Sequence, residues 1–214
     1  PEAMVNYLVR LGWSHGDQEI FTREEMIRYF SLEKVGKTPA IFDPQKLEWV
    51  NAHYIKTLPS SYLAGQMTPF WIQAGISEAE LEEASEEWLG SIVDALRERS
   101  RTLVEMAQSS RYFFQDPPGY DEKAQKALAA PLHSHLSELL AQIAGLSDFS
   151  ASNLEALYRQ FVEARGLKLA QIAQATRAAL TGSTASPPLF QVMEILGRYK
   201  VLRRLERALS RITA

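Results

Sequence analysis

The chain has no cysteine among its 214 residues, which excludes disulfide bonds, thiolate metal sites and cysteine nucleophiles. It also lacks any apolar run near the ~20 residues that a membrane-spanning helix requires, and its first residues do not follow the pattern of a signal peptide. We therefore expect a cytoplasmic protein that makes no membrane contact. Because the sequence begins with Pro1 and not with methionine, we also expect it to be a piece of a longer protein.

Sequence signatures of catalysis are missing as well. There is no glycine-rich phosphate loop after a strand, no nucleophile elbow and no recognisable pair of catalytic carboxylates. His133 and His135 are two residues apart and would point to different faces of a helix, while His15 and His53 have no carboxylate at ligand spacing. We expect these histidines to be structural or surface residues, and we predict no catalytic residue, metal site or bound cofactor in this chain.

Charge is distributed unevenly along an otherwise ordinary globular composition, 46% hydrophobic and 23% charged with a net charge of -3. Residues 77–88 hold six glutamates and no basic residue, a pattern typical of a helix with one solvated face. Residues 159–214 hold ten basic residues against three acidic ones. A basic end on a mildly acidic body fits a polyanion bound in one orientation, although charged surface helices without a ligand are also common.

Helical periodicity runs through almost the whole chain. Thr22 and Glu25 form a capping box, and Asp43 followed by Pro44 is a cap with proline at the first helical position. Only residues 37–42 are predicted to be extended, because Pro39 lacks an amide donor and disfavours helix in the residue before it. The predicted helices span residues 1–13, 22–30, 44–58, 67–75, 78–89, 91–114, 122–130, 132–144, 152–165, 168–180 and 189–213.

Two breaks divide this pattern into consecutive helical bundles. Residues 59–65 are predicted to form a joint, and the Asp-Pro-Pro-Gly sequence at residues 116–119 marks a second boundary. The sequence therefore predicts an all-α chain in three units, covering residues 1–62, 63–117 and 118–214.

Three arginines alternate with polar residues in the middle of the long helix predicted over residues 91–114. Arg97 and Arg101 are four residues apart and would share a face, while Arg99 would point elsewhere. A guanidinium can donate two parallel hydrogen bonds to a base edge or neutralise a phosphate. The alternative is structural, with these arginines paired to nearby glutamates.

The segment 177–190 carries the strongest binding signal. It contains Arg177 at the end of a predicted helix, then a Thr-Gly-Ser turn, then Pro187-Pro188-Leu189-Phe190 at the start of the next helix. A capped turn between two helices explains the glycine and the prolines, but it does not explain the arginine. An arginine beside hydroxyls, rigid prolines and exposed amides can bind a splayed base and its phosphates.

Several short sequence segments, in the same order along nearly the whole chain, resemble segments of bacterial glutamyl-tRNA synthetases of class I. The chain from residue 1 to 14 resembles the segment after the signature loop of their catalytic domain. The other matching segments are residues 19–21, 42–51, 54–55, 111–114, 177–183 and 202–208.

This resemblance implies a fold and a site. Residues 1–62 would end the stem-contact fold, and the two later units would form a helical anticodon-binding cage. In the family, an arginine and the turn after it contact anticodon bases, which implies roles for Arg177, Ser186, Pro187 and Leu189. A further arginine is associated with preferring cytosine at the third anticodon position. That role falls on Arg97, Arg99 or Arg101, with Arg99 and Arg101 favoured over Arg97.

The resemblance also implies a parent enzyme that esterifies glutamate to its tRNA with ATP and magnesium. The nucleotide-binding signatures of that enzyme are absent here, so we expect this chain to be inactive alone and to hold no cofactor. Its expected partner is the tRNA for glutamate, bound by a monomer. Glutaminyl-tRNA synthetases read the anticodon with β-barrels, so the helical pattern argues against that relative.

One alternative belongs to another functional class, a non-catalytic helical adaptor that binds protein partners in amphipathic grooves. Salt dependence separates the two hypotheses, because RNA binding weakens steeply with salt and apolar docking does not.

Overall fold

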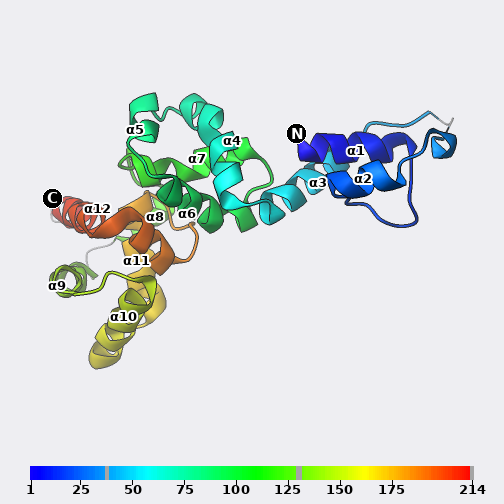
Figure 1. Cartoon of the computed structure of the whole chain (residues 1–214). Helices are drawn as coiled ribbons and strands as arrows, with labels where there is room; N and C mark the ends of the chain where they lie inside the picture. Colours follow the sequence, from blue (N-terminus) through cyan, green and yellow to red (C-terminus); the bar gives the residue numbers. More distant parts are fainter. Residues whose placement is uncertain (37–38, 129–131, 213–214) are drawn as a thin grey trace.

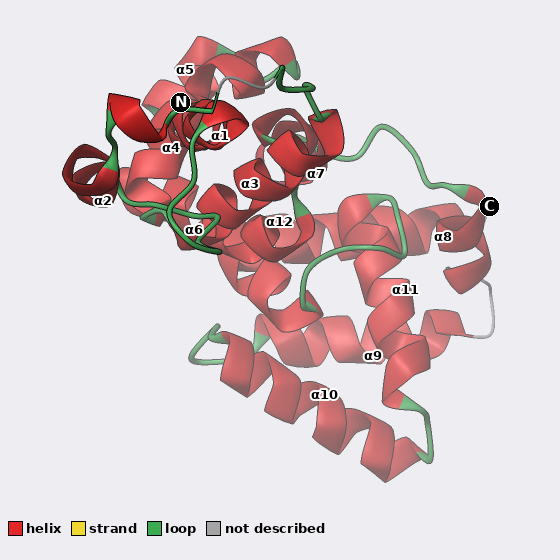
Figure 2. Cartoon of the chain, turned by 90° about the vertical axis from the view of Figure 1, so that its right-hand side faces the viewer, coloured by secondary structure: helices red, strands yellow, loops and turns green. Residues whose placement is uncertain are grey.

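The computed structural model describes residues 1–36, 39–128 and 132–212, and within them every regular element is helical. This confirms the all-α prediction. Figure 1 shows an elongated molecule in which the blue N-terminal helices lie at one end and the helices from α8 onward lie at the other. Figure 2, turned by 90° from this view, shows helices joined by loops, several of which are long.

The N-terminal end consists of α1 (Glu2–Gly12), α2 (Arg23–Tyr29), a 3-10 turn η1 (Leu32–Lys34) and α3 (Pro44–Thr57). Both predicted caps are present, since Thr22 completes its capping box and the Asp43 carboxylate accepts from the amide of Gln45 at 2.9 Å. Buried Asn6 in α1 accepts from the amide of Phe21 at 2.7 Å, which holds the segment before α2 against α1. Of the predicted extended segment, residues 37–38 lie outside the described chain, and residues 39–42 form no regular element.

The middle of the molecule consists of α4 (Ser60–Gln73), α5 (Glu78–Glu82), α6 (Glu86–Leu96), a 3-10 turn η2 (Arg97–Arg99) and α7 (Leu103–Phe114). The predicted joint at 59–65 is wrong, because α4 starts at Ser60, directly after Pro59. The predicted helix 78–89 is also interrupted, since the hydroxyl of Ser85 accepts from the amide of Trp88 at 3.2 Å and starts a new helix.

The predicted continuous helix 91–114 is wrong too. It divides into α6 and α7 because Thr102 caps α7, its hydroxyl accepting from the amide of Glu105 at 3.1 Å. Glu105 in turn accepts from the amide of Arg101 at 2.8 Å. The three arginines at 97, 99 and 101 therefore lie in a turn between two helices and not on one helical face.

The far end consists of α8 (Glu122–Ala127), α9 (His133–Ala144), α10 (Ala151–Arg165), α11 (Leu169–Thr181) and α12 (Leu189–Ile212). Helix α12 is kinked at Gly197, whose backbone has φ 75° and ψ 158°. The predicted helix ends at 130 and 213 lie outside the described residues.

One continuous hydrophobic core runs through the middle and far parts, from Ile55 in α3 to Leu209 in α12. A separate small cluster of Trp13, Phe21 and Met26 stabilises the N-terminal end. Within the large core, the indole of Trp88 in α6 donates to the carbonyl of Ile195 in α12 at 2.7 Å.

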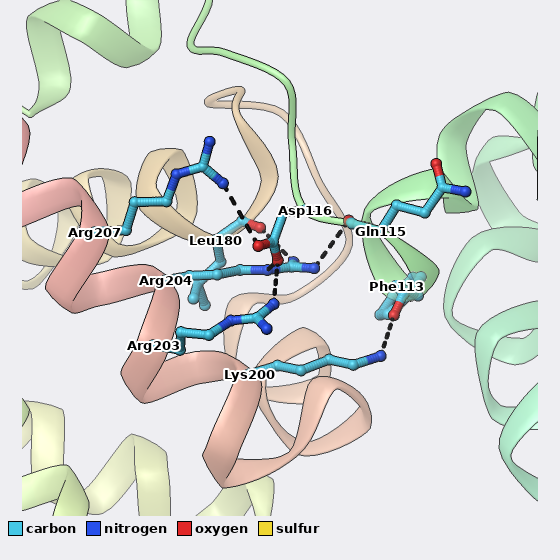
Figure 3. A network of polar contacts seen from close by, with 8 residues as sticks. All are labelled: Phe113, Gln115, Asp116, Leu180, Lys200, Arg203, Arg204 and Arg207. Carbon is cyan, nitrogen blue, oxygen red and sulfur yellow. Dashed lines mark hydrogen bonds and ion pairs between the residues drawn. The ribbon is translucent and has the colours of Figure 1, made fainter. Parts of the chain in front are cut away.

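A polar network joins the end of α7 to α11 and α12 (Figure 3). The guanidinium of Arg204 in α12 donates to the Asp116 carboxylate at 2.9 Å, to the Leu180 carbonyl at 2.7 Å and to the Gln115 carbonyl at 2.9 Å. Arg203 donates to the same carboxylate at 2.6 Å. These bonds fix the start of the segment after α7 against the end of α11, which is where the predicted binding loop begins.

Candidate nucleic-acid interface

Arg177 lies in the last two turns of α11, and the loop after the helix folds back onto it. Its Nε donates to the hydroxyl of Ser186 at 2.8 Å, and that hydroxyl donates to the carbonyl of Pro187 at 2.8 Å. Within the described chain no carboxylate forms an ion pair with Arg177. The guanidinium is therefore held at Nε, and no described residue accepts a hydrogen bond from its other N–H groups.

The loop is held in place at Gly182, where α11 ends. Gly182 has φ 77°, a left-handed conformation that favours glycine. A Cβ atom here would lie 2.6 Å from the carbonyl oxygen of Gly119. The amide of Asp121 donates to the Gly182 carbonyl at 3.0 Å. The loop therefore packs directly on the segment that follows α7, and only glycine fits at this contact.

The three arginines of the η2 turn have different surroundings. Arg97 pairs with Asp94 at 3.1 Å and donates to the carbonyl of Leu58, so it supports the junction of α3 and α6. Arg101 is exposed and pairs with Glu48 of α3 at 3.4 Å. The structural alternative therefore applies to both.

Arg99 differs from its two neighbours. It is exposed, and within the described chain its guanidinium makes no ion pair or hydrogen bond. Burial lowers the pKa of Arg177, and the nearby positive charge of Arg99 lowers it further. The charges of two arginines from distant parts of the sequence thus act on each other, and neither arginine forms an ion pair with a carboxylate of the described chain.

Tyr112 of α7 is the third member of this group. Burial raises the pKa of its hydroxyl, and the charges of Arg177, Arg99 and Arg204 oppose that rise. Residues 111–114 carry part of the family resemblance, but no pattern in the sequence predicts a role for Tyr112. Its neighbour Arg111 and the turn residue Thr181 line a pocket of about 210 Å³ beside it.

The remaining predicted contact residues have different exposures. Ser186 is half-buried and is held by Arg177. Pro187 and Leu189 are buried, and Leu189, at 4% exposed, belongs to the hydrophobic core. The buried side chains of Pro187 and Leu189 therefore support the loop from inside the protein, while Pro188 is exposed.

Comparison with known proteins shows which family the chain resembles. Residues 62–209 match the family described as "Anticodon binding domain". The chain belongs to this family. Residues 1–49 match a second family, described as "tRNA synthetases class I (E and Q), catalytic domain".

Individual relatives of the chain are glutamate–tRNA ligases. It is 47% identical over 213 residues to glutamate–tRNA ligase 1 of Syntrophus aciditrophicus (strain SB), covering 99% of this chain and 44% of the relative. It is 46% identical over 211 residues to glutamate–tRNA ligase of Geotalea uraniireducens (strain Rf4), again covering 44% of that protein.

A solved structure extends the match to three dimensions. The crystal structure of a glutamate tRNA ligase from Elizabethkingia meningosepticum in complex with its amino acid aligns with a TM-score of 0.86 at 28% identity, over 99% of this chain and 41% of that one. The family resemblance predicted from the sequence is therefore confirmed. The chain spans less than half the length of the relatives named here.

In this anticodon-binding chain most basic residues of α10 and α12 are engaged within the protein. Lys200 donates to the carbonyl of Phe113 at 2.9 Å, and Arg198 donates to the carbonyl of Ala144 at 3.2 Å. Arg165 pairs with Glu138 at 2.6 Å. The charged groups of these residues therefore hold helices together within the protein.

Two other findings concern the described residues. No cluster of three or more potential metal-ligating side chains occurs among them. None of the helices that the structure describes is both long enough and apolar enough to cross a bilayer.

Proposed function

We propose that this chain binds the tRNA for glutamate and reads its anticodon as part of a glutamate–tRNA ligase. Arg177 and the loop at 182–188 bind splayed anticodon bases, and Arg99 reads the third anticodon base. The family match supports the class of ligand. The single observation that carries the site is Arg177 itself, held by the Ser186 hydroxyl of the loop at 2.8 Å and forming no ion pair with any carboxylate of the described chain.

This arrangement is physically suited to RNA. Two guanidiniums held close together repel each other, which is unfavourable in the free protein unless an anion or a base edge satisfies both. A splayed base and its flanking phosphate supply acceptors for both guanidiniums at once. The choice of Arg99 for the third base follows because Arg97 and Arg101 are already paired with Asp94 and Glu48.

The supporting parts of the chain have proposed roles as well. Residues 1–62 form the end of a stem-contact fold, and residues 63–117 and 118–214 form the two parts of the anticodon-binding cage. Ser186, Pro187 and Leu189 belong to the site, the hydroxyl by holding Arg177 and the two buried side chains by shaping the loop. The protein acts as a cytoplasmic monomer.

The chemistry of the whole enzyme lies beyond these residues. We propose that a parent ligase joins glutamate to its tRNA with ATP and magnesium, and that the 214-residue chain alone positions the tRNA without catalysing this reaction.

The test is fluorescence anisotropy of the 214-residue chain with labelled tRNA for glutamate at one moderate salt concentration. The same tRNA with its third anticodon base changed from cytosine to guanine serves as the matched control. We expect the affinity for tRNA to fall clearly on that single change, because losing the hydrogen bonds to one base edge costs ~1–3 kcal/mol. Equal binding of both tRNAs with a steep salt dependence would indicate phosphate attraction alone. Absence of binding to either tRNA would favour the protein-adaptor alternative.

A further inference from the structure

The hydroxyl of Tyr112 is a buried polar group with no hydrogen-bond partner among the described residues. Leaving such a group unpaired in a folded protein costs about 1–3 kcal/mol. Elsewhere the same fold pairs its buried hydroxyls, since Tyr158 and Thr176 share a hydrogen bond at 3.0 Å. An unpaired hydroxyl therefore needs a reason of its own.

The location of Tyr112 supplies that reason. Its side chain lines the pocket of about 210 Å³ that reaches Thr181, the residue just before the binding loop. Thr181 lies one helical turn after Arg177, and its hydroxyl donates to the Arg177 carbonyl at 2.9 Å, which places Arg177 beside this pocket. The charges of Arg177, Arg99 and Arg204 also act on the Tyr112 hydroxyl. In such a field the O–H bond points away from the positive charges, which turns the oxygen lone pairs toward the guanidiniums.

Arg177 lacks a hydrogen-bond acceptor that the Tyr112 hydroxyl could supply. Ser186 holds its Nε at 2.8 Å, which fixes one edge of the guanidinium but leaves the plane free to rotate about that bond. A second acceptor at an Nη atom would fix the plane, and a guanidinium in a fixed plane can present paired N–H groups to a base edge. Tyr112 is the nearby group with an unused acceptor.

We propose that Tyr112 is a positioning residue of the anticodon site, whose hydroxyl oxygen accepts a hydrogen bond from an Nη group of Arg177 in the RNA complex. The Tyr112 hydroxyl and the Ser186 hydroxyl then hold the guanidinium from two sides, and its remaining N–H groups face the base. This role rests on the proposed function, because it is exercised only when a base is bound.

The test is Tyr112→Phe in the 214-residue chain, which removes the hydroxyl and leaves the ring. We expect the thermal midpoint not to fall, since the lost hydroxyl has no protein partner. We expect affinity for the tRNA for glutamate to fall roughly three- to tenfold, as for the loss of one ordinary hydrogen bond. In an Arg177→Ala background the same change has no further effect on affinity, because the group that it positions is gone.

Tyr158→Phe is the matched control, because that hydroxyl is buried and paired with Thr176. It lowers the thermal midpoint and leaves tRNA affinity unchanged in both backgrounds. Two results would overturn the positioning role while leaving the proposed function intact, provided that the wild-type chain binds and discriminates tRNA. One is that Tyr112→Phe binds tRNA as tightly as the wild-type chain. The other is that Tyr112→Phe lowers affinity as much in the Arg177→Ala background as in the wild-type background. If the wild-type chain fails to bind tRNA, the proposed function falls together with it.

Discussion

The carboxylate of Asp116 accepts a hydrogen bond from Nε of Arg204 at 2.9 Å, although Arg204 is only 2% exposed. The same guanidinium donates to the carbonyls of Leu180 at 2.7 Å and Gln115 at 2.9 Å (Figure 3). Leu180 lies at the end of α11 and Gln115 directly after α7. This ion pair therefore fixes the two helices that carry Arg177 and Tyr112, although neither of its members belongs to the proposed RNA surface.

Removing the charge of Asp116 is expected to destabilise this junction. Asp116→Asn keeps the shape but leaves Arg204 buried without its counterion, a change that costs about 3 kcal/mol when one partner of a buried pair is lost. Urea unfolding at neutral pH measures it. Glu122→Gln is the control, since Glu122 pairs with Lys126 at an exposed i,i+4 position and is expected to change stability by less than ~0.5 kcal/mol. Equal effects of the two variants would contradict a structural role for the network.

The same carboxylate predicts how stability depends on pH. Burial alone would raise the pKa of Asp116, but hydrogen bonds and charge from Arg204 and Arg203 outweigh it and hold the pKa below the ordinary value of 3.8. A lowered folded-state pKa means that the unfolded state binds the proton first. The stabilisation is therefore complete above about pH 4 and is lost as pH falls through the folded pKa.

The measurement is a series of urea unfolding curves from pH 7 to pH 2. We expect the unfolding free energy of the wild-type chain to fall below pH 4 more steeply than that of Asp116→Asn. Glu19 and Glu80, whose pKa values are also lowered by hydrogen bonds, contribute equally to both proteins and cancel in the comparison. If the unfolding free energies of the two proteins fell in parallel with pH, Asp116 would not contribute to the acid sensitivity of the fold.

Gly182 is expected to be intolerant of any side chain. Gly182→Ala forces a left-handed conformation, which costs roughly 1–2 kcal/mol, and places Cβ within 2.6 Å of the Gly119 carbonyl. The backbone of the loop must then shift, so tRNA affinity falls along with stability. Gly166→Ala is the control, because Gly166 has a similar φ of 62° with nothing within 4 Å of the added atom. It is expected to show the conformational cost alone and normal tRNA binding. A stability loss at Gly182 no larger than that at Gly166 would show that the segment holding Gly119 yields easily.

The sequence predicted the helical class and most helix positions because periodicity and caps are local properties. The caps at Thr22 and Asp43 were recognised and are present. The same reasoning missed the cap at Thr102, although Thr102 followed by Glu105 has the spacing of a helix start. The apolar residues before and after Thr102 recur at helical spacing, so the sequence pattern does not show that one helix ends and another begins there.

The site was less predictable, for a physical reason. Sequence spacing placed Arg97 and Arg101 together on a helical face, whereas the turn at η2 sends each to a different neighbour. The approach of Arg99 to Arg177 depends on how the middle and far parts pack against each other, and no local pattern contains that information. Tyr112 was missed because an unpaired buried hydroxyl can be recognised only after all of its neighbours are known.

The three arginines of the η2 turn provide a matched series for the proposed function. Arg99→Ala should cost ~1–3 kcal/mol of tRNA binding and should narrow the difference between tRNAs with cytosine and guanine at the third anticodon position. The reason is that Arg99 has no protein partner in the described chain and faces the same region as Arg177. Its removal should leave stability unchanged, since no internal contact is lost.

The neighbouring arginines should respond differently. Arg97→Ala should lower the unfolding free energy by about 1–3 kcal/mol, because the Leu58 carbonyl loses its charged donor, and should leave discrimination intact. Arg101→Ala breaks only an exposed pair with Glu48 and should change stability by less than ~1 kcal/mol. If Arg101→Ala abolished discrimination and Arg99→Ala did not, the third base would be read on the α3 side of the turn. The RNA would then have to cross the surface between α3 and α7 and not the one beside Tyr112.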